Sequence, residues 1–328
     1  MVPGTIRFNR VVRAGLAAVT AVLLACGCGG GGAGRGVVER GESISFLGVA
    51  VAGEVVWAVG TEGDRGAVFR YDGSWETVRT ADETLTGVSA SGDDVWVAGV
   101  AGSVLHFDGR AWTAWDLEVE GGLYCVSSAD GVHVWVAGDL GVVYYFDGTG
   151  WTIQDTPVRW NIKSVSAVDP EHVWAVGAGG ILFFNGRGWT LQYGTEGGGA
   201  FSGLSGVAAP DPTHAWACGT TDGGGTFSIL SWDGKDWKKA HSTGDLRLVG
   251  ICAIGPSSVY AASTEGFVYS AGGAFHTKRV LEDTERETLN GISASSVDEI
   301  WAVGTMTEIR YRTLTAFDRP VAVRLTSP

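Results

Sequence analysis

The sequence lacks the motifs by which catalytic sites are most often recognised. It contains no Gly-x-Ser-x-Gly elbow and no His-Glu-x-x-His metal motif, and its 5 cysteines do not have the spacing of a zinc site. The glycine runs at 197–199 and 223–225 are not followed by the Lys-Ser/Thr pair of a phosphate-binding loop. These absences argue against the commonest hydrolase, metalloprotease and nucleotide-binding sites.

Charge is also scarce, and positive charge is the scarcer sign. Charged residues make up 18% of the 328 residues, with 23 basic against 36 acidic side chains and a formal net charge of −13. Such a surface repels nucleic acid and anionic lipid headgroups. In contrast, 52 Gly and 14 Trp are typical of short, aromatic-packed strands joined by tight turns.

No apolar run near the N-terminus is long enough to span a membrane. Residues 14–25 form a run of 12, whereas a spanning helix needs about 20. Three arginines precede this run, and Leu23-Leu24-Ala25-Cys26 ends it. This arrangement is that of an export signal and resembles the bacterial lipobox, in which the cysteine is lipidated. The alternative is an ordinary signal peptide that happens to contain a cysteine, and Cys28 is a poorer lipidation candidate.

The lipobox resemblance divides the chain into three parts. Residues 1–25 are the predicted signal peptide, residues 26–42 a lipidated, Gly-rich tether, and residues 43–328 the folded body. We therefore expect a lipoprotein of the bacterial cell envelope whose only membrane contact is its lipid. Because no Asp follows Cys26, the resemblance favours the outer membrane over the inner. Removal of the three leader arginines would take the formal charge from −13 to −16.

The body contains seven repeats of a Val-Trp-Ala-Val-Gly signature. Steps of about 40 residues fit one four-stranded unit, whereas helical repeats of that period need helical periodicity. We interpret the apolar segment before each signature as strand a, the signature as strand b, and the aromatic run after it as strand c. An Asp-Gly or Asn-Gly turn then leads to strand d, as at Asp108-Gly109 with Trp112. The signature aromatics are Trp57, Trp96, Trp135, Trp174, Trp216, Tyr260 and Trp301.

These repeats predict an all-β, seven-bladed β-propeller of four-stranded antiparallel blades. Side-chain alternation places the Trp and second Val of each signature on one face of the blade, and the first Val and the Ala on the other. We expect the Trp rings to pack between blades, with each ring N–H bonded at the blade edge. Since the first repeat begins at strand a and the last ends in an extended Val321–Leu325, closure without strand exchange is a further prediction.

The repeat is similar to those of bacterial envelope propellers, in the style of photosystem-assembly-factor-like and Asp-box (sialidase-like) repeats. The Asp-box resemblance would imply a glycosidase with an arginine cluster, a Tyr nucleophile with a Glu partner, and an Asp acid. However, an Asp-box has a residue between its Asp and Gly, and Asp108-Gly109 has none. The arginines are also scattered over the repeats. We therefore predict a non-enzymatic scaffold, with a carbohydrate-active enzyme as the alternative.

Propellers usually bind at the face formed by the d–a and b–c loops. Aromatic and Arg residues in the d–a segments are typical binding anchors. The predicted partner is a protein or a polysaccharide, bound by a monomer without a cofactor, and no catalytic residue is identified. The candidate binding residues are Trp115, Arg159, Trp160, Tyr193, Phe201 and Arg247.

Two further groups of residues allow a structural and a functional interpretation. Three histidines each precede a signature aromatic by two positions: His133, His172 and His214. They are interpreted either as solvent-facing turn residues or as parts of a polar ring or weak metal site. Three cysteines remain in the body, and an odd number cannot all pair with one another. These are Cys125, Cys218 and Cys252. We expect them to be small buried core residues, and a disulfide between two of them is the alternative.

Overall fold

The computed structural model describes residues 7–8, 43–196, 203–221, 225–271, 273–281, 287–297, 299–310 and 315–326. Within this part of the chain the strands form seven separate sheets, and the only helical element is the 3₁₀ turn η1 (Asp139–Gly141). No described helix is long and apolar enough to cross a membrane. The predicted fold class, an all-β seven-bladed propeller, is confirmed.

Each of the first six blades takes four consecutive strands in the order a to d. Blade 1 is β2 (Ile44–Ala52), β3 (Val55–Glu62), β4 (Arg65–Tyr71) and β5 (Trp75–Ala81); blade 2 is β6 (Leu85–Ser91), β7 (Asp94–Gly99), β8 (Ser103–Asp108) and β9 (Trp112–Asp116); blade 3 is β10 (Leu123–Ser128), β11 (His133–Gly138), β12 (Val143–Asp147) and β13 (Trp151–Gln154). Blade 4 is β14 (Ile162–Asp169), β15 (His172–Gly177), β16 (Gly180–Phe184) and β17 (Trp189–Gly194); blade 5 is β18 (Gly203–Asp211), β19 (His214–Thr220), β20 (Phe227–Trp232) and β21 (Trp237–Gly244); blade 6 is β22 (Leu248–Gly255), β23 (Ser258–Ser263), β24 (Gly266–Ala271) and β25 (Ala274–Arg279).

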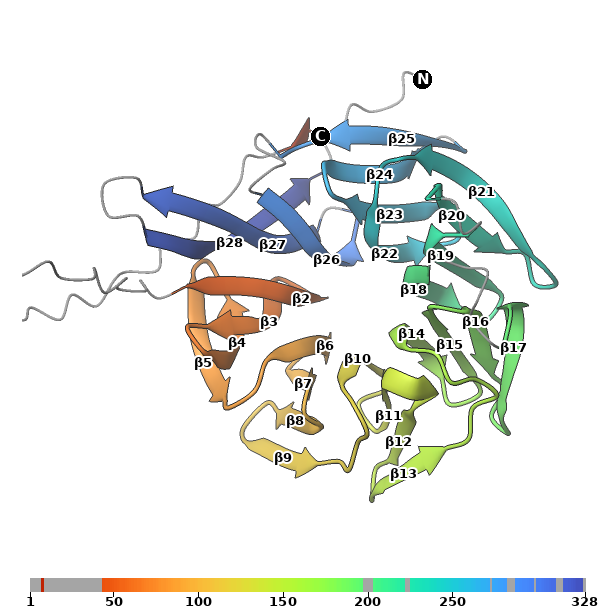
Figure 1. The fold of residues 1–328 in the computed structure, drawn as a ribbon, viewed down its shortest axis with the longest axis horizontal. Coiled ribbons are helices and arrows are strands. Elements are labelled where there is room, and N and C mark those ends of the chain that lie inside the picture. The colour runs from red at the N-terminus through yellow and green to blue at the C-terminus, as the bar shows by residue number, and fades with distance from the viewer. Residues whose placement is uncertain are drawn as a thin grey trace, which may run out of the picture.

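Blade 7 differs from the others because the C-terminal part of the chain supplies only three strands. These are β26 (Glu287–Ser296), β27 (Glu299–Arg310) and β28 (Thr315–Thr326). The two-residue β1 (Arg7–Phe8) pairs antiparallel with the end of β28, at Thr326 and Leu325. Figure 1 shows strand a of each blade nearest the centre of the ring, with the blades arranged around it in chain order. The rest of the predicted leader, the tether and Cys26 lie outside the described residues.

The signature strands pack as their alternation predicts. In blade 4, Trp174 and Val176 belong to a core cluster shared with blade 5, whereas Val173 and Ala175 belong to one shared with blade 3. Blade 1 shows the same division, with Trp57 packed against blade 2 and Val56 against blade 7. The hydrophobic core is therefore a ring of layers between blades, and each signature tryptophan is part of one layer.

The ring N–H groups of these tryptophans do not have the edge partners predicted from the sequence. Trp301 donates from Nε1 to Glu299 Oε1 at 2.5 Å. In contrast, the Nε1 atoms of five others are buried and have no hydrogen-bond partner in the described part of the chain: Trp57, Trp96, Trp135, Trp174 and Trp216. Leaving a buried donor without a hydrogen bond costs about 1–3 kcal/mol. Truncating a buried Trp costs about 3–5 kcal/mol, so the packing of the ring stabilises the blade by more than the unpaired N–H destabilises it.

Serine side chains on strand a connect neighbouring blades. The residue that pairs with the signature aromatic across strands a and b is Ser at four junctions, where its Oγ accepts a backbone N–H from the next blade. Ser89 accepts from Ser128 (3.1 Å), Ser127 from Ala167 (3.0 Å), Ser166 from Ala209 (3.0 Å) and Ser293 from Val51 (3.1 Å).

The last of these bonds joins blade 7 to blade 1 and so helps to close the ring. At the same junction the side-chain amide of Asn290 donates to the Phe46 carbonyl at 2.7 Å. The core cluster there combines Trp301 of blade 7 with Phe46 and Trp75 of blade 1. Side-chain contacts thus join blade 7 to blade 1, while the N-terminal β1 adds a fourth strand to the sheet of blade 7, so the described structure differs from the predicted closure without strand exchange.

The Asp-Gly and Asn-Gly turns between strands c and d have the predicted chemistry. Asp108 Oδ1 accepts the backbone N–H groups of Arg110 and Ala111 at 2.8 and 2.7 Å, and Gly109 has φ +84°. Asp147, Asn185 and Asp233 make the equivalent pair of bonds in blades 3, 4 and 5. These turns lie at the end of the blades opposite the d–a loops, because strands alternate in direction.

Candidate functional site

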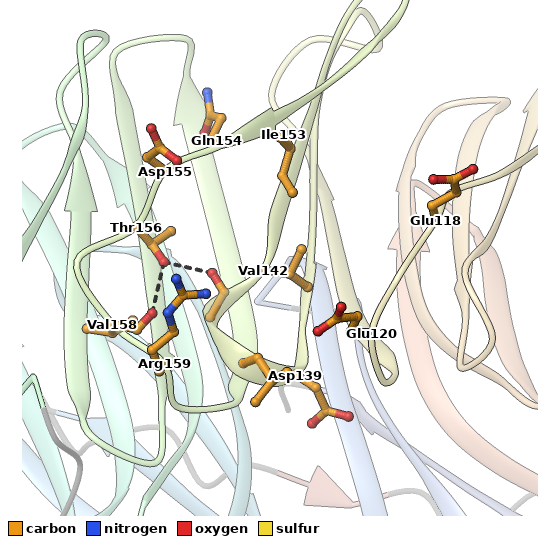
Figure 2. A pocket seen from close by; sticks show the side chains of 12 residues that line it. Glu118, Glu120, Asp139, Val142, Ile153, Gln154, Asp155, Thr156, Val158 and Arg159 are labelled. Atoms are coloured by element: carbon orange, nitrogen blue, oxygen red, sulfur yellow. Dashed lines mark hydrogen bonds between the residues drawn. The ribbon is translucent and has the colours of Figure 1, made fainter.

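A pocket opens on the face formed by the d–a and b–c loops, beside blade 3. Its volume is about 330 Å³. One wall comes from the β9–β10 loop with Glu118 and Glu120, and the floor from η1 and Val142 between β11 and β12. The other wall comes from the end of β13 and the β13–β14 loop, residues 153–159. Three segments that are separate in sequence therefore meet at one site (Figure 2).

Hydrogen bonds hold these three segments together. The Asp139 carboxylate accepts the Gly122 backbone N–H and the Tyr124 hydroxyl, each at 2.8 Å, and so attaches η1 to the preceding loop. The Thr156 hydroxyl donates to the Gly141 carbonyl at 2.8 Å and attaches η1 to the following loop. The shape of the pocket is thus determined within the protein before a ligand binds.

Asp139 and Tyr124 also connect the pocket to blade 4. Burial, together with the hydrogen bond to Asp139, raises the pKa of Tyr124 to about 12, so the hydroxyl remains a donor. The ammonium of Lys163, on β14, lies 3.7 Å from the centroid of the Tyr124 ring, a cation–π contact across the junction between blades 3 and 4. The base of the pocket is therefore part of a structural network.

The remaining charges in the pocket are predominantly negative. Besides Asp139, the lining contains Glu118, Glu120 and Asp155, and its single basic residue is Arg159. Figure 2 shows Glu120 and Arg159 approaching from opposite sides. No hydrogen bond or ion pair joins the side chains of Glu118, Glu120, Asp155 or Arg159 to another described residue. The pocket therefore has free charged groups of both signs, with acids in excess.

Exposed apolar side chains border the same pocket. Leu140 is 48% exposed and Ile153 is 65% exposed, and both line the cavity. Among the described non-glycine residues, only Leu140 has a positive φ, 56°, in the left-handed region that favours glycine. Its backbone N–H donates to Asn161 Oδ1 at 3.3 Å. The loop thus holds a large apolar side chain out toward solvent in a conformation that leucine rarely adopts.

Of the predicted binding residues, Arg159 is the one that lines this pocket. Trp160 follows it in sequence but is 7% exposed, packs in the core between blades 3 and 4, and donates from Nε1 to the Thr195 carbonyl at 3.2 Å. Trp115 is half-buried and stacks on Trp96, with ring centroids 5.6 Å apart. Both tryptophans therefore support the loops and do not present free rings to a partner.

The other three predicted residues are not gathered at this pocket. Tyr193 is on β17, half-buried against the core between blades 4 and 5. Arg247 is exposed, directly before β22, between blades 5 and 6. Phe201 lies outside the described residues. The five described candidates are thus spread over several blades, and of these five Arg159 alone lines this pocket.

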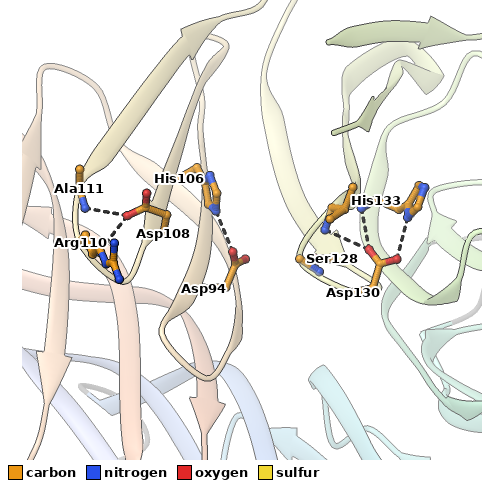
Figure 3. A network of polar contacts seen from close by, with 10 residues as sticks. Asp94, His106, Asp108, Arg110, Ala111, Ser128, Asp130 and His133 are labelled. Atoms are coloured by element: carbon orange, nitrogen blue, oxygen red, sulfur yellow. Dashed lines mark hydrogen bonds and ion pairs between the residues drawn. The ribbon is translucent and has the colours of Figure 1, made fainter. Parts of the chain in front are cut away.

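Each of the three histidines is paired with an aspartate of its own turn. His133 Nδ1 lies 2.7 Å from the Asp130 carboxylate. His172 Nδ1 lies 2.9 Å from Asp169, and His214 Nδ1 lies 2.9 Å from Asp211. Figure 3 shows one of these pairs beside the neighbouring blade, where His106 Nε2 lies 2.9 Å from Asp94. Among the described residues no group of three or more His, Cys, Asp or Glu could hold a metal ion. The polar turn interpretation fits these contacts.

The cysteines of the body are free thiols. Cys125 and Cys218 are buried and Cys252 is half-buried. Burial raises the pKa of the Cys125 and Cys218 thiols to about 12, so neither is a reactive thiolate. Cys125 and Cys218 are thus small buried core residues, as expected, and the disulfide alternative is not seen in the described structure.

Sequence reasoning missed Asp139, Leu140 and Ile153. The signal was present at η1, where Asp139-Leu140-Gly141 occupies the b–c turn that reads Ala178-Gly179-Gly180 in blade 4. A carboxylate followed by a bulky apolar residue thus replaces the Ala-Gly of blade 4. A search for departures from the repeat, and not only for aromatic or Arg residues, would have included Asp139 and Leu140 among the candidates.

The comparisons with known proteins give the fold. No protein-family model and no curated protein matches the chain. Among solved structures, one described as YCF48 bound to D1 peptide has a TM-score of 0.62 at 13% identity, over 88% of this chain and 95% of that one. YCF48 from Cyanidioschyzon merolae has a TM-score of 0.62 at 16% identity, over 88% and 97%. The WD40 propeller domain of Doa1 has a TM-score of 0.64 at 12% identity, over 88% and 94%. This chain is therefore a propeller of the kind seen in YCF48 and WD40 proteins.

Proposed function

We propose that this protein is a lipid-anchored scaffold of the bacterial cell envelope that binds a protein partner on the d–a and b–c loop face. The observation that carries the proposal is the pocket beside blade 3, whose walls are preorganised by hydrogen bonds while its charged and apolar groups remain free. Such concave, preformed sites are where proteins usually bind ligands and peptides.

The neighbours in fold support a protein partner. One of them was solved with a peptide bound, as its description states, although at 13% identity the binding residues do not carry over. The lining of the pocket also argues against the carbohydrate-active alternative, because it contains no aromatic side chain to act as a sugar platform. Without such a platform beside its carboxylates, the pocket lacks a feature expected of a glycosidase site.

The binding function is tested by crosslinking in cells that carry the tethered protein, followed by mass spectrometry. The test variant is Arg159→Ala with Arg247→Ala, since both side chains are exposed on the loop face. Arg187→Ala is the matched control, because it removes an exposed Arg from a c–d turn at the opposite end of a blade. One captured protein that the double variant loses and the control keeps would support the proposal. Capture of no protein would contradict it.

The anchor is tested separately by fractionation. Lipidation at Cys26 predicts that Cys26→Ala releases the protein from membranes, whereas Cys28→Ala leaves it there. Metabolic labelling with a palmitate analogue should be lost in the first variant alone. Retention of the Cys26→Ala protein in the membrane fraction would overturn the anchor and leave the binding proposal standing.

A further inference from the structure

The pocket beside blade 3 has a chemistry that selects one class of partner. We infer that it binds an extended peptide segment in which a Lys or Arg stands next to a branched aliphatic residue. This inference rests on the proposed binding function and deepens it. It is carried by the free groups of the lining, taken in two steps.

The first step is charge complementarity. Glu118 and Glu120 line one wall, and Asp155 lines the other. Since none of the three is paired with a described residue, their carboxylates are free to accept hydrogen bonds from an ammonium or a guanidinium. Asp139 adds negative charge at the base, although its oxygens are already bonded to Gly122 and Tyr124. A cation that enters the pocket therefore meets acids on both sides.

Arg159 restricts the partner further. Its guanidinium lines the pocket together with Glu120, so one basic and several acidic groups surround the same space. A backbone carbonyl or a carboxylate next to the bound Lys or Arg would satisfy this guanidinium. A free metal ion would offer the Arg159 guanidinium no acceptor, and an anionic ligand would be repelled by the carboxylates. A peptide carries both a cation and carbonyl oxygens, and it fits the arrangement.

The second step is the apolar contact. Leu140 and Ile153 are two of the four large hydrophobic side chains that are exposed in the described structure, and both line the pocket. Val142 lies with them in the lining and is half-buried. An aliphatic side chain of the partner would cover these groups and remove their apolar surface from water. A purely cationic ligand, such as a polyamine, would leave Leu140 and Ile153 exposed.

The size of the cavity agrees with such a segment. A volume of about 330 Å³ is at the lower end of the range for ligand sites and is enough for one or two side chains. The pocket therefore anchors a short stretch of a longer partner. The bonds of Asp139 and Thr156 keep its shape, so little ordering is required when the segment binds.

The test uses synthetic octapeptides in which two features are varied independently. The central residue is Lys, Ser or Glu, and the residues next to it are Leu or Ser. Binding to the purified propeller is measured by fluorescence anisotropy at low and at high salt. We expect the Lys–Leu peptide to bind best and to weaken with salt. The paired substitution Glu118→Gln with Glu120→Gln should weaken its binding by on the order of tenfold. Ile153→Ser should weaken it without changing the salt dependence.

The matched control is Glu54→Gln with Glu171→Gln, which removes the same charge from exposed a–b turns at the opposite end of the blades. This control should bind the Lys–Leu peptide as the parent protein does. Equal binding of the Glu–Leu peptide, or equal loss in the control, would overturn the inference, as would the absence of binding by any peptide. Circular dichroism of each variant verifies that the propeller remains folded.

Crosslinking in cells separates this inference from the proposed function. A partner that is captured equally by the parent protein and the Glu118→Gln/Glu120→Gln variant would leave the scaffold function standing and would overturn the pocket assignment. Loss of the partner from this variant alone, together with a basic and aliphatic crosslinked segment in its sequence, would support both.

Discussion

The junctions between blades 3 and 4 and between blades 6 and 7 show how unevenly one repeat can be stabilised. The first contains the fully buried Trp135, the bond from the Ala167 N–H to Ser127 and the contact of Lys163 with Tyr124. The second has Tyr260 in place of the tryptophan and Cys252 in place of the serine.

The difference teaches which part of the repeat is essential. Every junction has an apolar layer, and the layer between blades 6 and 7 contains Phe267, Leu289 and Ala302. The bond from strand-a Ser to the next blade is present at four junctions, whereas blade 6 has Cys252 at that position, so this bond adds to a ring that apolar packing already forms. Because Tyr260 and Cys252 stand where other blades have Trp and Ser, we expect the junction between blades 6 and 7 to be the first to open when the propeller unfolds.

The largest expected effect distinguishes the two aromatic residues. Trp135→Ala removes a fully buried ring and should lower the free energy of unfolding by about 3–5 kcal/mol. Tyr260→Ala removes a smaller ring that is 8% exposed, and it should cost less. Urea titration followed by tryptophan fluorescence and circular dichroism measures both. An equal or larger loss at Tyr260 would contradict the ranking of the junctions.

The next effect concerns the last residue of the signature, which is Gly138 in blade 3 and Ser263 in blade 6. A Cβ on Gly138 would lie 1.8 Å from the Gly122 carbonyl oxygen, so Gly138→Ser forces two strands apart and should cost about 1–3 kcal/mol or more. Ser263 Oγ accepts the backbone N–H groups of Gly266 at 3.0 Å and of Glu265 at 3.3 Å. The reverse change, Ser263→Gly, should therefore cost only the loss of these two bonds, about 1–2 kcal/mol.

A control for the glycine experiment is available at Gly53, where a Cβ would have no neighbour within 4 Å. Because its φ is +64°, Gly53→Ala carries backbone strain without a clash. Thermal unfolding should place this variant between the parent protein and Gly138→Ser. If Gly53→Ala and Gly138→Ser were equally unstable, close strand packing would not be the reason for the signature glycine.

A smaller effect tests the polar connections directly. Ser127→Ala leaves the Ala167 N–H without its partner and should cost about 1–2 kcal/mol. Cys252→Ser places a hydroxyl at the equivalent position of blade 6 and should add up to about 1 kcal/mol if it bonds to blade 7. Hydrogen exchange at Ala167 and at Ala294, the equivalent residue of blade 7, reports on each junction. Unchanged protection at both amides would contradict the role of these serines.

The fold was predictable because its determinants repeat seven times. The signature, the Asp-Gly turns and the alternation of the Trp and Val faces each recur, so a single ambiguous repeat did not matter. The pocket was not predictable in the same way, since Asp139 and Leu140 occur once and their meaning depends on contacts with Tyr124 and Asn161. Exposure was the least predictable property, because Trp160 is in a loop and is nevertheless buried.

The smallest effect concerns the Asp–His turns, which blade 5 has and blade 6 lacks, with Gly255 and Ser258 at the two positions. Hydrogen bonds from the Thr213 hydroxyl and from His214 lower the pKa of Asp211 to about 2. A carboxyl whose folded pKa is lowered stabilises the protein above its unfolded pKa, near 3.8, and loses that contribution as the pH falls toward 2. Asp211→Asn should therefore be less stable than the parent at pH 6, and the gap should be much smaller at pH 2. Urea midpoints at the two pH values measure it, and a gap of equal size at both would show that the charge of Asp211 does not stabilise the turn.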